Sequence, residues 1–285
     1  MTGRVLLSVG HGYSAEATRR RLGPGWHVIA TTRDAEKAAR LSADGVEAVL
    51  WPGTDLTPLI ARATHLLSSV PPIAGADPVA PAIARAGTAA RGLVWAGYYS
   101  TSGVYGDRQG GWVDETGDLA AGTARGQARI AAESAWQALG LPLHIFRLAA
   151  IYGPGRSAFG RLEAGTARRV TRPGLVFSRI HVGDIARITA ASMAAPRPGA
   201  IWNLADDCPG PPGEVIVEAA RLMGVAPPPE QALEESDLSA MARDFYSESK
   251  RVANGRVKAM LGQPLLYPDH RAGLRAVRAA EAAGG

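Results

Sequence analysis

Short apolar runs alternate with alanine-rich amphipathic stretches through the first half of the chain. A short apolar run bounded by glycine, proline or aspartate is typical of a buried strand, whereas apolar positions three and four apart indicate one face of a helix. The pattern predicts strands at Val5–Val9, His27–Thr31, Glu47–Leu50, His65–Ser69, Leu93–Ala96 and Leu143–Leu148.

Helices are predicted between these strands. Asp34 and Asp55 each precede an amphipathic stretch and are expected to cap a helix N-terminus. The predicted helices cover Ser14–Leu22, Asp34–Leu41, Asp55–Ala63, Val79–Arg85 and Thr123–Leu139. Strands that alternate with helices predict an α/β fold, a doubly wound parallel sheet with helices on both faces.

The pattern changes after Tyr152, where Gly153-Pro154-Gly155 opens a stretch rich in glycine and arginine, and prolines cluster after Asp206. We expect a first domain over residues 1–152 plus 181–204, and a smaller α+β lobe over 153–180 plus 205–285. Further strands are predicted at Arg179–Val182 and Ala200–Leu204, and further helices at Ile185–Met193 and Asp269–Ala282.

The composition is that of an ordinary globular protein. The 285 residues are 46% hydrophobic and 20% charged, which excludes a disordered or fibrous chain. The single cysteine, Cys208, cannot form an internal disulfide, so a reducing compartment is expected. The N-terminal run is too short for a signal-peptide core, and no stretch approaches the about 18 apolar residues of a membrane span. We therefore expect a cytoplasmic protein with no membrane partner.

The charged residues do not indicate a nucleic-acid or metal partner. The chain has 31 basic against 26 acidic residues, and only three of the basic ones are lysines. The excess is scattered, and no basic stretch is interleaved with aromatic residues, so no nucleic-acid partner is predicted. Six histidines and one cysteine without close ligand spacing predict no metal site.

A glycine-rich turn joins the first predicted strand to the first predicted helix, in the sequence Gly10-His11-Gly12-Tyr13-Ser14-Ala15. In such a G-x-G-x-x-A turn the first glycine permits a tight turn, the second lets a pyrophosphate approach the backbone, and the small third residue allows close packing of helix on strand. The turn predicts a dinucleotide site. His11 either helps to bind the phosphates or is a tolerated loop residue.

The end of the second strand decides between the two nicotinamide cofactors. An acidic residue there would bind a ribose 2′-hydroxyl, and a basic one favours a 2′-phosphate. The chain has Thr32-Arg33, and we assign the following Asp34 to helix capping. NADP(H) is therefore predicted ahead of NAD(H), and the alternative is that Arg33 is only a solvated surface charge.

Four motifs in the right order resemble the extended short-chain dehydrogenase/reductases, the NAD(P)-dependent epimerase/dehydratase family. They are Ser100–Gly106, Arg147–Gly155, Ile180–Ala186 and the pair Leu261-Gly262 with Gly273-Leu274. More narrowly, His65–Pro78 and Phe177–Val182 look like an atypical subgroup. The resemblance implies a Rossmann domain with a C-terminal substrate lobe. The predicted cofactor-binding residues are Gly10, His11, Gly12, Tyr13, Ser14, Ala15, Thr32, Arg33, Ser69, Val70, Pro71 and Ile151.

The resemblance also implies a catalytic Ser/Thr, Tyr and Lys. The Ser/Thr position falls on Thr101, with Ser100 and Ser102 as close competitors. Counting back from Ala132-Glu133, the Tyr-x-x-x-Lys motif is replaced by Arg125 and Arg129. Arginine keeps its proton above a pKa of about 12, so neither can act as acid or base. They either bind anionic groups or are solvated helix residues.

Substitute proton donors are Tyr105, Tyr152 and His181, which lie on motifs that border the substrate cleft in this family. The alternative for each is a structural role. Sugar-nucleotide 4,6-dehydratases of the family carry an acidic pair where this chain has Ser102-Gly103, which argues against dehydration by that route.

The leading hypothesis is an NADP(H)-dependent oxidoreductase or epimerase that acts on a small polar or nucleotide-linked substrate and uses a non-standard proton donor. Its substrate phosphates would bind Arg156, Arg161, Arg168 or Arg169, unless these face solvent. The alternative is a non-catalytic NADP(H)-binding sensor. The sequence does not decide whether the protein forms a homodimer through the helix at residues 123–139.

Overall fold

The computed structural model describes residues 3–236, 238 and 240–284. The chain divides into two compact units, and each is made of segments that are separate in sequence. The first comprises Met1–Thr101, Ala124–Arg147 and Ile185–Trp202, and the second comprises Ser102–Thr123, Leu148–Asp184 and Asn203–Gly285. Residues 102–123, 148–152, 181–184 and 203–204, which the sequence predicts in the first domain, lie in the second unit.

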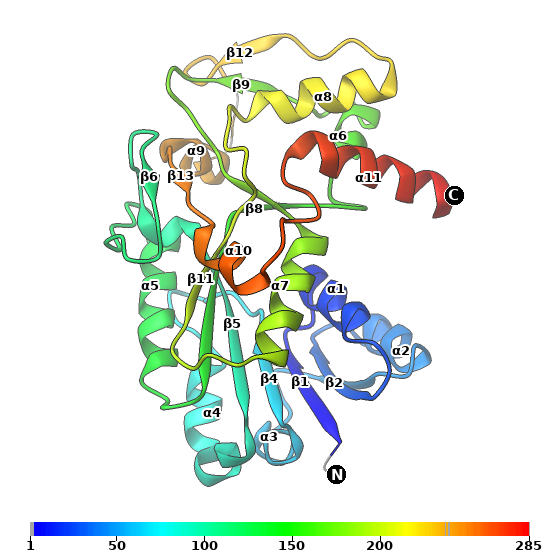
Figure 1. Cartoon of the computed structure of the whole chain (residues 1–285), viewed down its shortest axis with the longest axis vertical. Helices are drawn as coiled ribbons and strands as arrows, with labels where there is room; N and C mark the ends of the chain where they lie inside the picture. Colours follow the sequence, from blue (N-terminus) through cyan, green and yellow to red (C-terminus); the bar gives the residue numbers. More distant parts are fainter. Residues whose placement is uncertain (1–2, 237, 239, 285) are drawn as a thin grey trace. The chain divides into compact units, whose positions relative to one another are not determined.

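A seven-stranded parallel sheet forms the centre of the α/β fold, as predicted (Figure 1). Its order, β3-β2-β1-β4-β5-β7-β11, reverses direction between β1 and β4, which is the arrangement of a Rossmann sheet. The strands are β1 (Arg4–Val9), β2 (Trp26–Thr32), β3 (Glu47–Leu50), β4 (His65–Ser68), β5 (Trp95–Thr101), β7 (Leu143–Leu148) and β11 (Ile201–Leu204).

The helices of the first unit lie close to their predicted positions: α1 (Tyr13–Leu22), α2 (Ala35–Ala43), α3 (Thr57–Arg62), α4 (Ala80–Ala86), α5 (Ala124–Gln137) and α7 (Val182–Ala194). Asp34 caps α2, because its carboxylate accepts the Lys37 N–H at 3.0 Å. The residue that caps α3 is Leu56 rather than the predicted Asp55, which lies one residue earlier and accepts the backbone N–H of Thr57 at 3.0 Å. Short aspartate side chains thus satisfy donors that the first turn of a helix leaves free.

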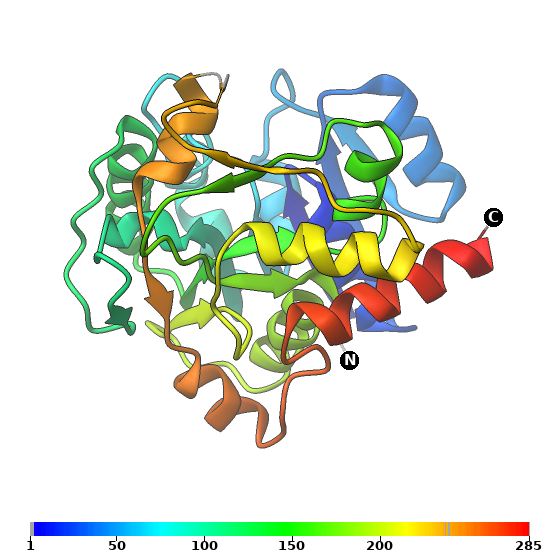
Figure 2. The same cartoon turned by 90° about the horizontal axis from the view of Figure 1, so that it is seen from above.

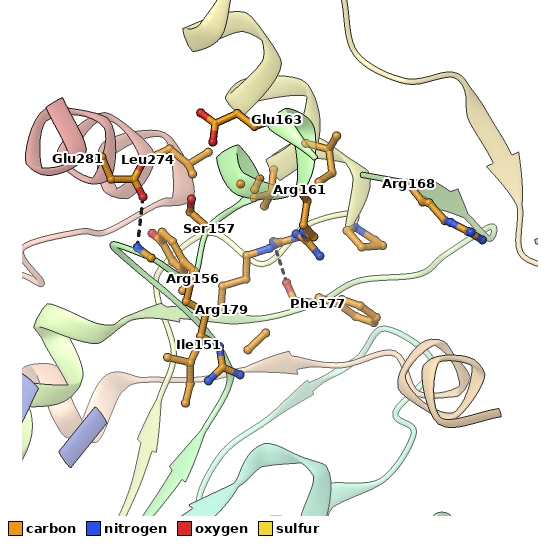
Figure 3. Close-up of a pocket in the computed structure, with 18 of the residues that line it drawn as sticks. Ile151, Arg156, Ser157, Arg161, Glu163, Arg168, Phe177, Arg179, Leu274 and Glu281 are labelled. Atoms are coloured by element: carbon orange, nitrogen blue, oxygen red, sulfur yellow. Dashed lines mark hydrogen bonds between the residues drawn. The ribbon is translucent and has the colours of Figure 1, made fainter. Parts of the chain in front are cut away.

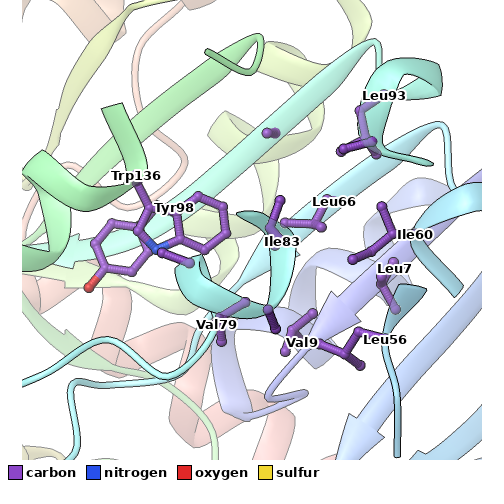
Figure 4. Packing of buried hydrophobic residues seen from close by; sticks show 14 of the residues in the cluster. Leu7, Val9, Leu56, Ile60, Leu66, Val79, Ile83, Leu93, Tyr98 and Trp136 are labelled. Atoms are coloured by element: carbon purple, nitrogen blue, oxygen red, sulfur yellow. The ribbon is translucent and has the colours of Figure 1, made fainter. Parts of the chain in front are cut away.

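Two adjacent tyrosines of β5 show that both faces of the sheet are covered. Tyr98 stacks on Trp136 of α5, with the ring centroids 5.4 Å apart, inside a cluster that also includes residues of α3 and α4 (Figure 4). Tyr99 points to the opposite face, where its hydroxyl bonds Thr18 of α1 and Thr189 of α7, both at 2.8 Å. Alternate side chains of a strand point to opposite faces, so β5 is buried on both sides.

β5 is longer than predicted and is displaced toward its C-terminal end. The sequence pattern predicts the strand at Leu93–Ala96. In the structure Gly97 lies inside the strand, where a Cβ would overlap the Trp95 indole. The glycine therefore makes room for a large neighbour instead of ending the element, and Thr101 becomes the last residue of the strand.

The second unit contains three small parallel pairs. They are β8 (Ala150–Tyr152) with β10 (Arg179–His181), β9 (Arg169–Thr171) with β12 (Glu230–Ala232), and β6 (Trp112–Val113) with β13 (Arg251–Val252). Its helices are α6 (Ala158–Glu163), α8 (Gly213–Met223), α9 (Ala240–Ser247), α10 (Gly255–Leu261) and α11 (His270–Gly284). Figure 2 shows α8 beside α11, and both contribute to a small core with Phe159 of α6. Within the described residues, every helix is too short or too polar to cross a bilayer.

The Trp136→Ala variant is expected to lower the free energy of unfolding by about 3–5 kcal/mol, because it leaves a cavity beside Tyr98 in a fully buried site. Urea unfolding followed by circular dichroism measures this loss. Trp112 is 64% exposed, and Trp112→Ala serves as the matched control with an expected loss below about 0.5 kcal/mol. Equal losses in the two variants would contradict the packing described here.

Candidate functional site: a glycine loop in the first unit and an arginine pocket in the second

Gly10, at the end of β1, occupies a position that only glycine fits. Its φ of +73° lies in the left-handed region, and a Cβ there would overlap the side chain of Val70, which follows β4. The turn can therefore approach the neighbouring strand only without a side chain. This contact brings the loop after β1 and the segment after β4 together at the point where the strand order reverses.

Gly12 has a different role, because the space beside it is open. Its φ is −97°, and the nearest atom to a Cβ built there is the Gly10 carbonyl oxygen at 3.7 Å. α1 begins at the next residue, and within the described part of the chain no side chain caps it. Ala15 is buried, as close packing of helix on sheet requires. The first-turn N–H groups of α1 and the open space at Gly12 fit a pyrophosphate.

The backbone of the loop is held on both sides. Thr31 of β2 accepts the Gly10 N–H on its hydroxyl at 2.8 Å, and its carbonyl accepts the His11 N–H at 2.9 Å. The Ser69 hydroxyl donates to the Gly10 carbonyl, and the Lys37 ammonium donates to the His11 carbonyl. The loop is thus fixed in one conformation before any ligand binds, which lowers the entropic cost of binding.

The His11 side chain is buried beneath the loop. Its Nδ1 lies 2.8 Å from the Ser8 hydroxyl and its Nε2 lies 2.9 Å from the Glu16 carboxylate. Burial lowers the pKa of His11, and although burial raises the pKa of Glu16, hydrogen bonds from Arg19 and His11 bring it down to about 2. A neutral imidazole therefore donates to an ionised Glu16 and accepts from Ser8. Both ring nitrogens are engaged inside the protein, which favours the second of the two roles considered for this residue.

At the end of β2, Arg33 and Asp34 have different surroundings. Thr32 is buried, and its hydroxyl accepts the Asp34 N–H at 3.2 Å. Arg33 is exposed, while Asp34 is engaged in capping α2. Of the other predicted cofactor residues, Tyr13 and Ser14 form the first turn of α1, Pro71 is exposed after Val70, and Ile151 lies in the second unit.

Arg125 and Arg129 of α5 differ in their surroundings. Arg129 donates to the Tyr98 hydroxyl at 2.8 Å and to the Tyr99 carbonyl at 3.0 Å, and its guanidinium lies 5.7 Å from the centre of the Tyr98 ring. Burial raises the pKa of Tyr98 to about 12, so this phenol stays protonated at neutral pH. Arg129 thus binds α5 to β5, whereas Arg125 is exposed. Thr101, at the end of β5, is partly exposed.

A buried network next to Thr101 escaped the sequence analysis. The Ser100 hydroxyl donates to the Glu133 carboxylate at 2.6 Å, and Arg147 of β7 donates to the same carboxylate at 2.7 Å. All three side chains are almost fully buried. The position of Glu133 in the sequence gives no signal for the strand that its carboxylate contacts. The network fixes α5 against β5 and β7.

Tyr152 and His181 are neighbours in the second unit. They form a register pair of β8 and β10, with ring centroids 5.2 Å apart. His181 accepts the Gly183 N–H on Nδ1 at 3.0 Å, and its ring lies 3.8 Å from that of Tyr267. Burial lowers the pKa of His181 to about 4 and raises the pKa of Tyr152 above its usual value. Neither group therefore titrates near neutral pH.

The Tyr105 side chain is enclosed in the interior of the second unit. Its ring is fully buried, and its hydroxyl donates to the Asn203 side chain at 2.7 Å within the second unit. The Asn203 N–H in turn donates to the buried Glu115 carboxylate at 2.9 Å. A phenol enclosed in this way joins parts of the unit that are distant in sequence.

A pocket of about 740 Å³ opens in the second unit (Figure 3). Its charged lining is Arg156, Arg161, Glu163, Arg168, Arg179 and Glu281. Ile151 lines this pocket, and so do Phe177 and Tyr246, whose ring centroids are 5.7 Å apart. Arg169 does not line it and instead pairs with Glu230 at 2.7 Å. Four arginines against two glutamates give the pocket a positive balance that suits an anionic ligand.

Solved structures share this fold over the whole chain. A conserved protein of unknown function from Silicibacter pomeroyi is 50% identical, with a TM-score of 0.92 and coverage of 98% of this chain and 99% of that one. MoeE5 in complex with UDP-glucuronic acid and NAD is 19% identical, with a TM-score of 0.78 and coverage of 99% and 100%. UDP-glucuronic acid 4-epimerase from Bacillus cereus in complex with NAD is 14% identical, with a TM-score of 0.73 and coverage of 96% and 99%. No family model matches the chain, and neither does any curated protein.

The two loop glycines are expected to differ in their tolerance of alanine. Gly10→Ala should lower the free energy of unfolding by more than about 1 kcal/mol, because its φ is positive and its Cβ overlaps Val70. Gly12→Ala should unfold like the wild type, since its φ is ordinary and the space is open. Urea unfolding of both variants measures the difference, and a loss at Gly12 equal to that at Gly10 would contradict the geometry.

Proposed function

We propose that this chain, which belongs to one family with the Silicibacter pomeroyi protein and has the extended short-chain dehydrogenase/reductase fold of NAD-dependent epimerases and dehydratases, is an NADP(H)-dependent oxidoreductase or epimerase. We further propose that its substrate is nucleotide-linked. The observation that carries the proposal is the open, uncapped turn at Gly12, preceded by a Gly10 that has no room for a side chain.

The first unit is the proposed cofactor domain. The N–H groups of the first turn of α1 would bind the pyrophosphate, and Gly12 leaves the space for it. Arg33, exposed at the end of β2, would bind the 2′-phosphate, because the acid next to it in sequence, Asp34, is engaged at the helix cap. NADP(H) bound there would supply a hydride donor or acceptor.

The second unit is the proposed substrate domain. The lining arginines supply positive charge for a diphosphate, and the Phe177–Tyr246 pair offers aromatic faces for a base. MoeE5 is described with a UDP-sugar and NAD together, and the likeness in fold supports the same class of substrate here.

Few side chains of the proposed site can donate or accept a proton in the proposed reaction. The Thr101 hydroxyl would hydrogen-bond a substrate oxygen, and Arg125 would attract its anionic part. Arg129 is engaged by Tyr98 and Tyr99, and arginine holds its proton at every working pH. The proton donor is therefore a group other than the tyrosine and lysine that the family resemblance implies.

A second candidate function is an NADP(H) sensor without turnover. The arginines on α5 favour it, because they leave that helix without a group that titrates near neutral pH. Equilibrium binding of NADPH, with no change in its absorbance across a panel of carbonyl, imine and nucleotide-sugar compounds, would favour the sensor. Cofactor oxidation or reduction with any of them would favour the enzyme.

Arg33→Ser is expected to weaken NADPH binding by tenfold or more and to leave NADH binding unchanged, because it removes the cation assigned to the 2′-phosphate. Fluorescence titration measures both affinities. Arg40→Ser, at an exposed arginine of α2, is the matched control and should change neither, while Gly12→Ala should weaken both. Equal NADPH affinity in wild type and Arg33→Ser would refute the cofactor assignment.

Thr101→Ala is expected to lower turnover about a hundredfold once a substrate is found, because a positioned donor to the reacting oxygen is lost. Thr101→Ser should restore most of the activity. Steady-state rates with UDP-glucose or UDP-glucuronic acid, followed at the nicotinamide absorbance, provide the measurement. Unchanged turnover in Thr101→Ala would remove this residue from the mechanism.

A further inference from the structure

Arg179 is a buried cation whose charge is not neutralised by direct contact with an acid. It is 6% exposed and lines the pocket of the second unit (Figure 3). Its guanidinium donates to the backbone carbonyls of Phe177, Gly210 and Pro211, at 3.3, 3.3 and 2.8 Å. In the described part of the chain it forms no ion pair within 4.0 Å. Burying a charge without a counter-ion is costly, so the pocket favours an anionic occupant at this residue.

Asp206 is a buried acid joined to the same strand. It is 1% exposed, and its backbone N–H donates to the Arg179 carbonyl at 2.6 Å. One carboxylate oxygen accepts the Cys208 N–H at 3.1 Å, and within the described residues the other has no partner. A half-satisfied, buried carboxylate favours its protonated form, and burial raises the pKa of Asp206 to about 7.

The other groups that act on this pair come from several elements. Asp207 and Asp269 raise the pKa of Asp206, whereas Arg179 lowers it. Glu214 of α8 and the Tyr152 and Cys208 side chains also act electrostatically on Arg179, after Asp206 in size. His270 of α11 has a pKa lowered by burial, so it is neutral at pH 7. Asp206 is thus a group near Arg179 whose charge changes around neutral pH.

We propose that Arg179 anchors the anionic group of the ligand in this pocket, and that Asp206 makes this binding proton-linked. The pocket holds the anion while Asp206 is protonated and loses affinity as Asp206 ionises. The ligand class, a nucleotide-linked diphosphate, rests on the function proposed above. Asp206 is not among the residues that line the pocket and acts through the effect of its charge on Arg179, so it is a positioning residue rather than a catalytic one.

The affinity of the pocket for an anion should fall as the pH rises. An ionised Asp206 offsets the field of Arg179 and repels a bound anion, whereas a protonated one does neither. A bound anion must then raise the affinity of Asp206 for its proton by the same factor. The dissociation constant should therefore be flat below pH 7 and rise above it, by up to about tenfold per pH unit while one proton is linked to binding.

UDP-glucose is the probe for this test, because both of its phosphates are esterified and its uracil ring stays neutral up to about pH 8, so its charge is constant over that range. Calorimetric titration from pH 6 to 8, in two buffers of different ionisation enthalpy, gives the dissociation constant and the protons taken up. The wild type should take up as much as one proton near pH 8. Asp206→Asn should bind equally at all pH values, close to the wild type at pH 6, and Arg179→Gln should bind at least tenfold more weakly throughout.

Asp207→Asn is the matched control. Asp207 lies next to Asp206 but is bound by Lys258 and Asn254 at the surface, so its variant should keep the wild-type dependence of affinity on pH, shifted to lower pH because one charge that raises the pKa of Asp206 is gone. A flat wild-type profile, or a slope that persists in Asp206→Asn, would overturn the proton linkage. Unchanged affinity in Arg179→Gln would overturn the anchor. If Arg179→Gln does not fold, the affinity of Arg179→Lys tests the anchor, and the wild-type pH profile tests the proton linkage.

Sulfate, which keeps its charge over the same range, separates this proposal from the proposed function. If UDP-glucose fails to bind but sulfate raises the unfolding temperature more at pH 6 than at pH 8, and Asp206→Asn removes that difference, then the anion site stands and the nucleotide-linked substrate does not. If UDP-glucose binds with no pH dependence, the proposed substrate class stands and the proton linkage falls. If neither probe binds, Arg179 is not an anion anchor.

Discussion

The contact between Gly10 and Val70 is the constraint on which the first unit depends. Parallel strands end at the same edge, and the loops after β1 and β4 meet where the strand order reverses. A side chain at residue 10 would push these loops apart. Because the approach is so close, Thr31 and Ser69 can each bond the backbone of Gly10, and α1 begins with its free N–H groups beside an open space.

Polar groups inside the first unit serve mainly to join its layers. Arg129 donates to the Tyr98 hydroxyl and to the Tyr99 carbonyl, so it joins α5 to β5. Glu133 and Arg147 form a buried ion pair, and the Glu133 carboxylate also accepts the Ser100 hydroxyl. Removing one partner of such a pair is strongly destabilising, because it leaves an uncompensated charge in a medium of low dielectric constant. In this protein α5 therefore contributes stability where the family resemblance implies acid–base chemistry.

The second unit contains buried ionisable groups whose pKa values depend on their surroundings. Four arginines line its pocket, and one of them, Arg179, has backbone carbonyls as its hydrogen-bond partners among the described residues. Burial moves the pKa of His181 and of Tyr152 away from neutrality in opposite directions, whereas it brings that of Asp206 toward it. The same desolvation acts on all three groups, and its sign differs because an imidazole is charged when protonated and a carboxyl or phenol when deprotonated.

The sequence by itself determined the strand and helix order of the first unit, the Asp34 cap and the glycine turn, because hydrophobic period, capping and turn chemistry are local properties. It did not determine that Gly97 continues β5, that the His11 ring turns inward to Glu16, that Arg129 meets Tyr98, or that residues 102–123 fold with the second unit. Only the tertiary structure decided these, since the partner of a long side chain, and the burial that sets a pKa, depend on residues distant in sequence.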